Sequence, residues 1–316
     1  MDKLRLVRDT SKVIIRERIF TLPGRIMNSL DLNPNDVAFF AYLSVVGVLI
    51  LVFRSHLPLW PYYLMAQTAL IVTAFLVIRT SQMVSWLPLT ILRQWYPVLS
   101  FTFLYMQAGI LNQMVFSGYW DDFFARADLW IFGVEPGIWM FDNFSNSWLN
   151  ELLHACYFSY YIIPVTLGLI LYWQRDTGFY RAMFGFSVTF YICYFMYILI
   201  PVAGPIHLRE GRFVDNTFFV HIMDQIYASV EKPGAAFPSS HVAIAVITLM
   251  YAWRLRRNFF WIVLPIILGL ILSTVYGFYH YTIDVFAGIV VAVVSYYICN
   301  WIYDRYAVKY FTEEIP

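Results

Sequence analysis

The chain has 316 residues, of which 60% are hydrophobic and only 13% are charged. An average soluble domain is about half apolar and about a quarter charged, so this chain has too little charge to cover the surface of a water-soluble enzyme. The formal net charge of +1 gives no reason to expect nucleic-acid binding. The three cysteines lie in apolar stretches, which favours neither a disulfide framework nor a zinc site. The composition therefore indicates an integral membrane protein.

Apolar segments of about the length needed to cross a bilayer recur along the chain. A spanning helix needs about 20 predominantly apolar residues. Candidate segments lie at 37–53, 60–78, 95–116, 149–173, 182–201, 239–253, 259–277 and 282–303. They are continuously apolar and do not alternate as the strands of a membrane barrel do. We therefore predict an all-α, polytopic helical bundle of about eight transmembrane helices, with two long polar loops at 117–148 and 202–238.

The basic residues predict how these helices are oriented. Cytoplasmic loops of membrane proteins carry an excess of Lys and Arg. If the N-terminus is cytoplasmic, all but five of the 21 Lys and Arg residues fall on the cytoplasmic side; the exceptions are Arg54, Arg126, Arg209, Arg212 and Lys232. We therefore predict that both termini are cytoplasmic and that both polar loops face the periplasm, the exterior or a lumen.

An acidic residue stands alone in the last apolar stretches of the chain. Between Asn258 and Tyr303 the only charged side chain is Asp284, four residues after His280 in the segment HYTID. A carboxylate in such a stretch is costly and indicates a functional site. On one helical face the carboxylate could accept a hydrogen bond from the imidazole and leave its other nitrogen free as a nucleophile or base. The alternative is a buried pair that only holds two helices together.

The segment FPSSHVAIAV (237–246) has the pattern of a helix start. Ser239 and Ser240 follow a proline and precede an apolar run. The unpaired backbone N–H groups and the positive dipole end of a helix start form a natural phosphate site. The alternative is simple capping by Ser239, with His241 bound to a loop carbonyl. In the predicted topology His241 and His280 lie at the same outer boundary, which favours a phosphoryl-transfer site with one nucleophile and one proton donor.

These residues resemble the motifs of a known family. Pro238-Ser239-Ser240-His241 is similar to the PSGH motif of the type 2 phosphatidic acid phosphatase superfamily, with Ser240 in place of glycine. STVYGFYHYTID (273–284) resembles the SRxxxxxHxxxD motif. The resemblance implies that His280 is the nucleophile and forms a phosphohistidine, and that Asp284 orients it. It also implies that His241 is the general acid and that Ser239, with Ser240 beside it, binds phosphate.

The chain departs from the family pattern in its cations. Thr274 occupies the arginine position of the third motif, and no KxxxxxxRP motif is found. Phosphoryl transfer needs positive charge around the phosphate oxygens. The outer-face candidates are Arg212 and Arg209, then Lys232 and Arg126. The alternative for the two loop arginines is a surface charge balanced by Glu210 or Asp215.

In these departures the chain resembles one branch of the superfamily, which contains inositol phosphorylceramide synthases and sphingomyelin synthase-like proteins. DLWIFGVEPGIWM and LLHACYFSYYIIP are also similar to upstream segments of that branch. Within them, His154 and Asp128 are candidates for an acceptor site, or else each ends a helix. We expect the adjacent Asp121 and Asp122 to be a solvated loop pair.

The expected domain organisation and function follow from the topology and the resemblance. Residues 1–36 would be a basic cytoplasmic segment, either an amphipathic helix on the membrane or an ordinary topogenic segment. Two additional transmembrane helices (37–94), a six-helix catalytic core (95–303) and a cytoplasmic tail (304–316) would follow.

The predicted function is that of an integral membrane lipid-phosphate phosphatase that acts through a phosphohistidine at the outer membrane face. One alternative is a lipid phosphotransferase of the inositol phosphorylceramide or sphingomyelin synthase type, and another is a non-catalytic lipid-binding or transport protein. The expected partners are a phospholipid or other lipid phosphate and the bilayer, with no nucleic acid. No metal or other cofactor is expected, and no oligomeric state is predicted.

Overall fold

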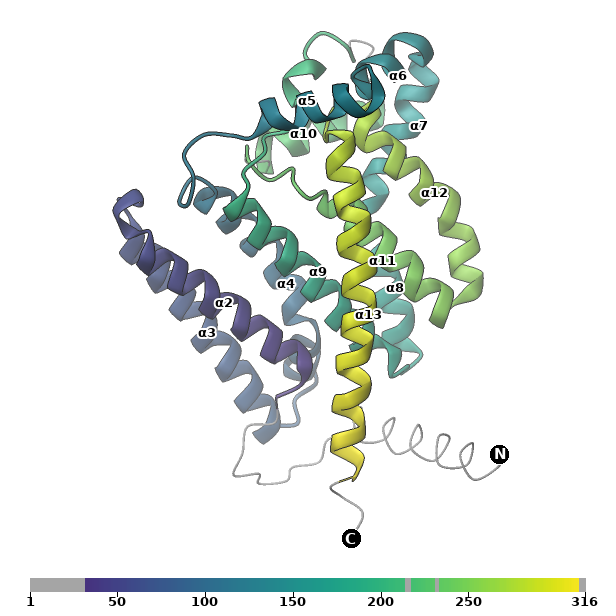
Figure 1. Ribbon diagram of the computed structural model, residues 1–316. Helices are drawn as coiled ribbons and strands as arrows, with labels where there is room; N and C mark the ends of the chain where they lie inside the picture. Colours follow the sequence, from purple (N-terminus) through teal and green to yellow (C-terminus); the bar gives the residue numbers. More distant parts are fainter. Residues whose placement is uncertain (1–31, 214–216, 231–232, 313–316) are drawn as a thin grey trace. The chain divides into compact units, whose positions relative to one another are not determined.

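The computed structural model describes residues 32–213, 217–230 and 233–312, and within these ranges it is built from helices. The longer helices are α2 (Pro34–Val52), α3 (Trp60–Met83), α4 (Leu87–Leu111), α9 (Gly178–Leu199), α12 (Arg257–Tyr276) and α13 (Thr282–Thr312) (Figure 1). The shorter ones are α5 (Asp121–Phe132), α6 (Pro136–Phe144), α7 (Ser147–Phe158), α8 (Ile163–Trp173), α10 (Phe218–Val230) and α11 (Ser240–Leu255). Short 3-10 helices lie at Arg54–His56, Ser159–Tyr161 and Pro205–Arg209. The predicted all-α class is confirmed.

Each predicted apolar segment overlaps a helix, and the one at 149–173 covers both α7 and α8. Within the described ranges, five helical segments are long and apolar enough to cross a membrane: α2, α3, α9, α12 and the Thr282–Arg305 part of α13. A sixth span results if Ser147–Tyr161 and α8, which meet at a bend of 42°, are counted together. The segment predicted at 239–253 is α11, a shorter apolar helix, and the one at 95–116 overlaps α4. The chain is a polytopic helical membrane protein.

The two segments predicted as polar loops contain helices. The 117–148 segment includes α5 and α6, and the 202–238 segment includes α10 and the 3-10 helix Pro205–Arg209. The α5 helix ends at Gly133, whose φ of 72° belongs to the left-handed region that glycine enters at no steric cost. The prediction of polar loops was therefore wrong for these residues. The reason is that a search for apolar segments of spanning length cannot detect such short helices.

The described residues 32–101, 168–188 and 297–312 form one compact unit. Within it, α2 packs against α3, and the start of α2 is closed by a reciprocal capping box between Asn33 and Asp36. The buried Asp36 carboxylate also accepts hydrogen bonds from the Arg93 guanidinium and from the Tyr96 hydroxyl, the latter at 2.7 Å. This ion pair satisfies a carboxylate that could not otherwise be buried.

The described residues within 102–167 and 189–296 form the second unit, which contains the predicted histidines and Asp284. Here α12 packs against both α7 and α11, and α10 packs against α7. One apolar cluster of this unit joins Leu153 of α7 to Phe213, Val220, Tyr276 and Phe278. These contacts support the turn between α12 and α13. The predicted domain boundary near residue 95 stays a prediction. The basic segment predicted at the N-terminus and the tail predicted at the C-terminus stay predictions too, since residues 1–31 and 313–316 lie outside the described ranges.

Candidate active site

Two backbone segments meet at the candidate site: the start of α11 and the start of α13. Ser239 caps α11, as predicted, because its hydroxyl accepts a hydrogen bond from the Val242 N–H at 3.3 Å. The Ser239 N–H itself donates to the Asp284 carbonyl at 3.1 Å. A side chain on Gly288, one turn after Asp284, would place its Cβ 2.6 Å from the Ser239 carbonyl oxygen. The two helix starts are thus in backbone-to-backbone contact, which requires glycine at 288.

This contact leads to a stability prediction. Gly288→Ala should destabilise the fold by about 1–3 kcal/mol, because backbone and not a flexible side chain must move to admit the methyl group. Thermal unfolding in detergent measures the change. Gly47→Ala in α2 is the matched control, since its Cβ would meet only the Leu64 side chain at 3.9 Å, an ordinary contact. Equal stability of the two variants would contradict the prediction.

The turn before α13 holds His280 through its backbone. The N–H groups of Tyr279 and His280 both donate to the Thr274 carbonyl at 3.0 Å. Phe278, between them and α12, has a φ of 58°, which is unfavourable for a bulky residue and common at functional turns. The Thr274 hydroxyl donates to the Ile271 carbonyl of its own helix. Thr274, which stands where the family's motif has arginine, therefore contributes its backbone carbonyl to the turn.

A second glycine packs closely against the backbone of this turn. Gly204 has a φ of 83°, and a Cβ there would lie 2.7 Å from the Tyr279 carbonyl oxygen. Its close approach supports the residue that directly precedes His280.

The two histidines and Asp284 lie together. His280 Nδ1 is 3.5 Å from Asp284 Oδ2, an ion-pair distance that is longer than a usual hydrogen bond. The same carboxylate oxygen accepts from the Tyr281 N–H at 2.9 Å, so Asp284 is fixed to the turn. The His241 and His280 ring centroids are 5.8 Å apart, and the two side chains are only 8% and 4% exposed. Two imidazoles and a carboxylate therefore share a protected site at the start of α11.

Aromatic rings enclose His241. The Tyr157 ring stacks on the imidazole at 4.7 Å between centroids, and Tyr160 approaches it at 4.2 Å. The other face of Tyr157 stacks on Tyr279 at 4.2 Å, and its hydroxyl lies 2.6 Å from that of Tyr227. Within the described part of the chain, the buried His241 Nδ1 has no hydrogen-bond partner. The rings thus orient the imidazole while one of its nitrogens stays available.

Two carboxylates of α5 also hold the turn before α13: Asp128, which the sequence suggests as an acceptor-site candidate, and Asp121, which sequence reasoning did not place at the site. Asp128 accepts hydrogen bonds from the Thr282 and Ile283 N–H groups at 2.7 and 3.1 Å, at the start of α13. Burial raises the pKa of Asp128, and these hydrogen bonds offset part of the rise. Asp121 accepts from the Ala203 and Gly204 N–H groups, both at 2.9 Å.

The expectation of a solvated Asp121 was therefore wrong, whereas Asp122 is exposed. Asp128 lies within α5 and closes the start of another helix, so it does not end its own. The seven-residue spacing of Asp121 and Asp128, two turns on one helical face, is the signal that could have revealed them.

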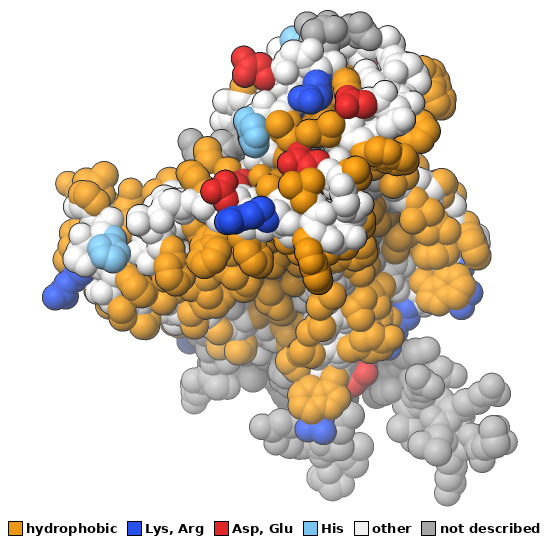
Figure 2. Space-filling view, turned by 45° about the horizontal axis from the view of Figure 1, so that its top comes forward, with side chains coloured by type: hydrophobic (Ala, Val, Ile, Leu, Met, Phe, Trp, Pro, Cys, Tyr) orange, Lys and Arg blue, Asp and Glu red, His pale blue; other side chains and the backbone are white. Residues whose placement is uncertain are grey.

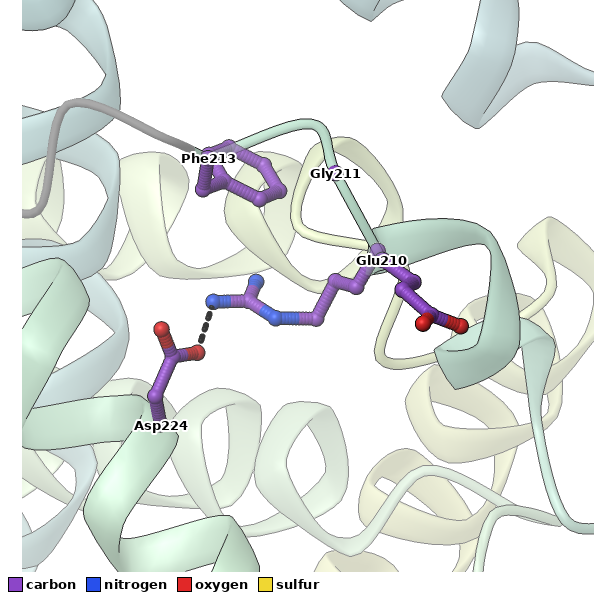
Figure 3. A pocket seen from close by; sticks show the side chains of 5 residues that line it. Glu210, Gly211, Phe213 and Asp224 are labelled. Carbon is purple, nitrogen blue, oxygen red and sulfur yellow. Dashed lines mark hydrogen bonds and ion pairs between the residues drawn. The ribbon is translucent and has the colours of Figure 1, made fainter.

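Arg209 lies beside the same turn. Its guanidinium donates to the Gly277 carbonyl at 2.9 Å, contacts His154 Nε2 at 3.0 Å and pairs with Asp224 at 2.6 Å. It also lies over the Tyr279 ring, 4.7 Å from the centroid. His154 is buried in the middle of α7 and does not end a helix. A cavity of about 260 Å³ opens at this arginine; Figure 3 shows its lining by Glu210, Gly211, Phe213 and Asp224, with the ion pair dashed.

The other predicted cations are placed differently. Arg212 donates to the Leu208 carbonyl and lies over the Phe278 ring, 5.0 Å from its centroid. Arg126 is exposed on α5 and donates to the Asp122 carbonyl. Lys232 lies outside the described residues. The structure thus brings together Ser239, Ser240, His241, His280 and Asp284. In the adjoining turn, Arg209 contacts the Gly277 carbonyl and Arg212 lies over the Phe278 ring.

The space beside His280 is small. A cavity of about 20 Å³, room for roughly one water molecule, lies between His280, Asp128, Glu135 and Tyr281. Among the residues that the structure describes, no group of three or more His, Cys, Asp or Glu side chains is arranged to hold a metal ion.

The fold and the site together define a class: a polytopic helical membrane protein with two histidines and an aspartate at a helix start. The PAP2 superfamily matches residues 130–298, more than half of the chain and all of these residues. The chain belongs to the PAP2 superfamily. It is a membrane enzyme of the lipid phosphatase and phosphotransferase kind.

One curated relative gives a closer comparison. The phosphoinositol dihydroceramide synthase of Bacteroides thetaiotaomicron is 36% identical over 98 residues, which are 30% of this chain and 30% of that protein. The match thus spans less than a third of the relative's length. No solved structure matches this chain significantly.

Proposed function

We propose that the protein takes a phosphate-bearing group from a lipid through a covalent phosphohistidine on His280. The observation that carries this proposal is the convergence of His280, Asp284 and His241 at the start of α11, with both imidazoles buried. The Asp284 carboxylate faces Nδ1 of His280 at 3.5 Å, and we assign Nε2 of the same ring as the nucleophile. His241, on the neighbouring helix, is the proton donor.

In the first step, His280 Nε2 attacks the phosphorus, and the bond from phosphorus to the leaving lipid oxygen breaks. His241 gives its proton to that oxygen, and a lipid alcohol departs. In the second step, the neutral His241 takes the proton of an acceptor hydroxyl. The acceptor oxygen bonds to phosphorus, the P–N bond breaks, and both histidines return to their first state. A metal is not needed for either step.

For the acceptor, we propose a lipid alcohol ahead of water. The relative that supports this is named a phosphoinositol dihydroceramide synthase, and a lipid alcohol, like the donor lipid, is present in the membrane that the protein spans. Release of phosphate to water is the second candidate and uses the same three residues.

One experiment separates the two acceptors. Purified protein is incubated with a phospholipid labelled on phosphorus, with and without a ceramide-like alcohol. A new labelled lipid that forms only with the alcohol supports transfer. Release of labelled, water-soluble phosphate in both samples supports hydrolysis. Absence of both products, with a protein that unfolds cooperatively, would overturn the catalytic proposal.

Arg209 is the proposed phosphate-binding cation, together with the backbone of Ser239 and Ser240 at the start of α11. Arg209→Ala should lower the rate at least about tenfold, or 1.4 kcal/mol, because a guanidinium can bind two phosphate oxygens at once. Arg209→Lys should recover only part of the loss. Arg212→Ala, which removes a guanidinium held over a ring, is the matched comparison and should cost less. Full activity in both alanine variants would move the phosphate site to Lys232 or Arg126.

We also propose that both termini are cytoplasmic and that the site faces the periplasm, the exterior or a lumen. The distribution of the 21 Lys and Arg residues supports this orientation.

A further inference from the structure

The α5 helix buries a carboxylate and exposes several large apolar side chains, which is unusual for a helix on a water-soluble protein. Its inner face carries Phe124 and Asp128, which are 4% and 3% exposed. Its outer side carries Phe123, Trp130 and Ile131, and Val134 follows just after the helix; all four are exposed, Trp130 to 87%. These four residues are called here the α5 apolar face, and the exposed Arg126 lies beside them on the same side. In water a helix would place its apolar side toward the protein and its polar side outward.

The length and direction of α5 exclude a transmembrane span. Twelve residues of α-helix are about 18 Å long, whereas the hydrocarbon core of a bilayer is about 30 Å thick. Figure 1 shows α5 lying crosswise to α13, at the end where α13 begins. The Asp128 carboxylate holds α5 at this end of α13 by accepting hydrogen bonds from the Thr282 and Ile283 N–H groups. The helix therefore lies at one end of a membrane-spanning segment, where the headgroups of a bilayer are found.

The neighbouring surface indicates what covers the α5 apolar face. Phe286 and Val290 of α13, within the span Thr282–Arg305, are 54% and 60% exposed and face lipid in a membrane protein. Phe286 lies one turn beyond Thr282 and Ile283, whose N–H groups donate to Asp128, so exposed apolar side chains occur both on α5 and near the start of α13. Figure 2 shows broad hydrophobic areas with few charged side chains among them on the face that it presents.

We propose that α5 lies in the headgroup–acyl boundary of the bilayer, with the α5 apolar face inserted among the lipids. Tryptophan is enriched at this depth because its ring is amphipathic, and interfacial helices insert their apolar side about 5–10 Å below the headgroups. The inner face of the same helix holds the turn that carries His280. The depth of α5 thus sets the depth of His280 at the level of lipid phosphates. That consequence rests on the proposed function, whereas the lipid contact does not.

The test uses single cysteines at two exposed positions, one on the α5 apolar face and one on another helix. Trp130→Cys and the control His221→Cys on α10 are labelled with a small fluorophore and reconstituted into phosphatidylcholine vesicles. The unsubstituted chain measures labelling of the three native cysteines. Lipids with a nitroxide near the headgroup or near the chain end act as shallow and deep quenchers, and iodide acts as the aqueous quencher.

For the label at 130, we expect shallow quenching to exceed deep quenching at least about twofold, as interfacial depth requires, with little quenching by iodide. The label at 221 should be quenched mainly by iodide. Equal iodide quenching at both positions would overturn the proposal, because α5 would then be in water. Stronger deep quenching at 130 would overturn it in favour of a buried span. No lipid quenching at 130 would show that protein, such as a second copy of the chain, covers this face.

Discussion

His280→Ala is expected to abolish turnover and, with it, any acid-labile phosphoprotein. His280 is the proposed nucleophile, and its other ring nitrogen already faces the Asp284 carboxylate. The measurement is rapid acid-free quenching of protein mixed with phosphorus-labelled lipid, followed by gel detection of protein-bound label. His221→Ala is the control, since His221 is exposed on α10 and bound to Gln225. Label retained on the His280→Ala protein would show that another residue is the nucleophile.

Because His280 is buried, a second variant separates chemistry from folding. Asp284→Asn keeps the size of the side chain, and it removes the charge that orients the imidazole and stabilises its cationic form. In comparable Ser-His-Asp sites the loss in rate is roughly 10⁴-fold, and we expect at least about 10³-fold here, or 4 kcal/mol. Thermal unfolding of both variants in detergent verifies that they fold. If Asp284→Asn were about as active as the unchanged protein, the His280–Asp284 pair would have a structural role only.

His241→Ala is expected to slow the reaction according to the leaving group. A general acid contributes about 10²- to 10⁴-fold when the departing oxygen is strongly basic, as a lipid alkoxide is. An activated aryl phosphate needs little protonation, so its rate should fall much less. The ratio of the two rate losses is therefore the measurement, and it is independent of the amount of active protein.

The aromatic surroundings of His241 supply the control for this experiment. Tyr157→Phe preserves the ring stacked at 4.7 Å and removes only the hydroxyl that faces Tyr227. It should affect both substrates by the same small factor. Equal losses on both substrates in His241→Ala would contradict the proton-donor role and favour a role in binding.

The features that could be predicted from the sequence share one property: they are encoded by residues close together in the chain. Hydropathy over about 20 residues predicted a helix at every apolar segment, because any helix in a bilayer must satisfy its own backbone hydrogen bonds. The start of α11 was predictable because Ser239 caps a helix whose first N–H groups lie two to three residues away. His280 and Asp284 are four residues apart, and a lone carboxylate in an apolar stretch has few roles other than a functional one.

The short helices were not predictable in this way. The α5 helix has too few residues to span a membrane, and its charged residues made 117–148 read as a polar loop. Its inner carboxylates, Asp121 and Asp128, bind backbone N–H groups of other segments. Those partners are far away in the chain, so they leave no pattern that a hydropathy window detects.

The sequence by itself determined the membrane class, the helices at the apolar segments and the motif residues of the PAP2 superfamily. Only the tertiary structure decided which residues support that site: Asp128 at the start of α13, Tyr157 on His241, and Arg209 on the Gly277 carbonyl. Asp128 and Thr282 are 154 residues apart in the chain. Such contacts arise because a buried N–H group, imidazole or guanidinium must find a partner wherever the packed helices supply one. Spacing along the chain carries no information about that partner.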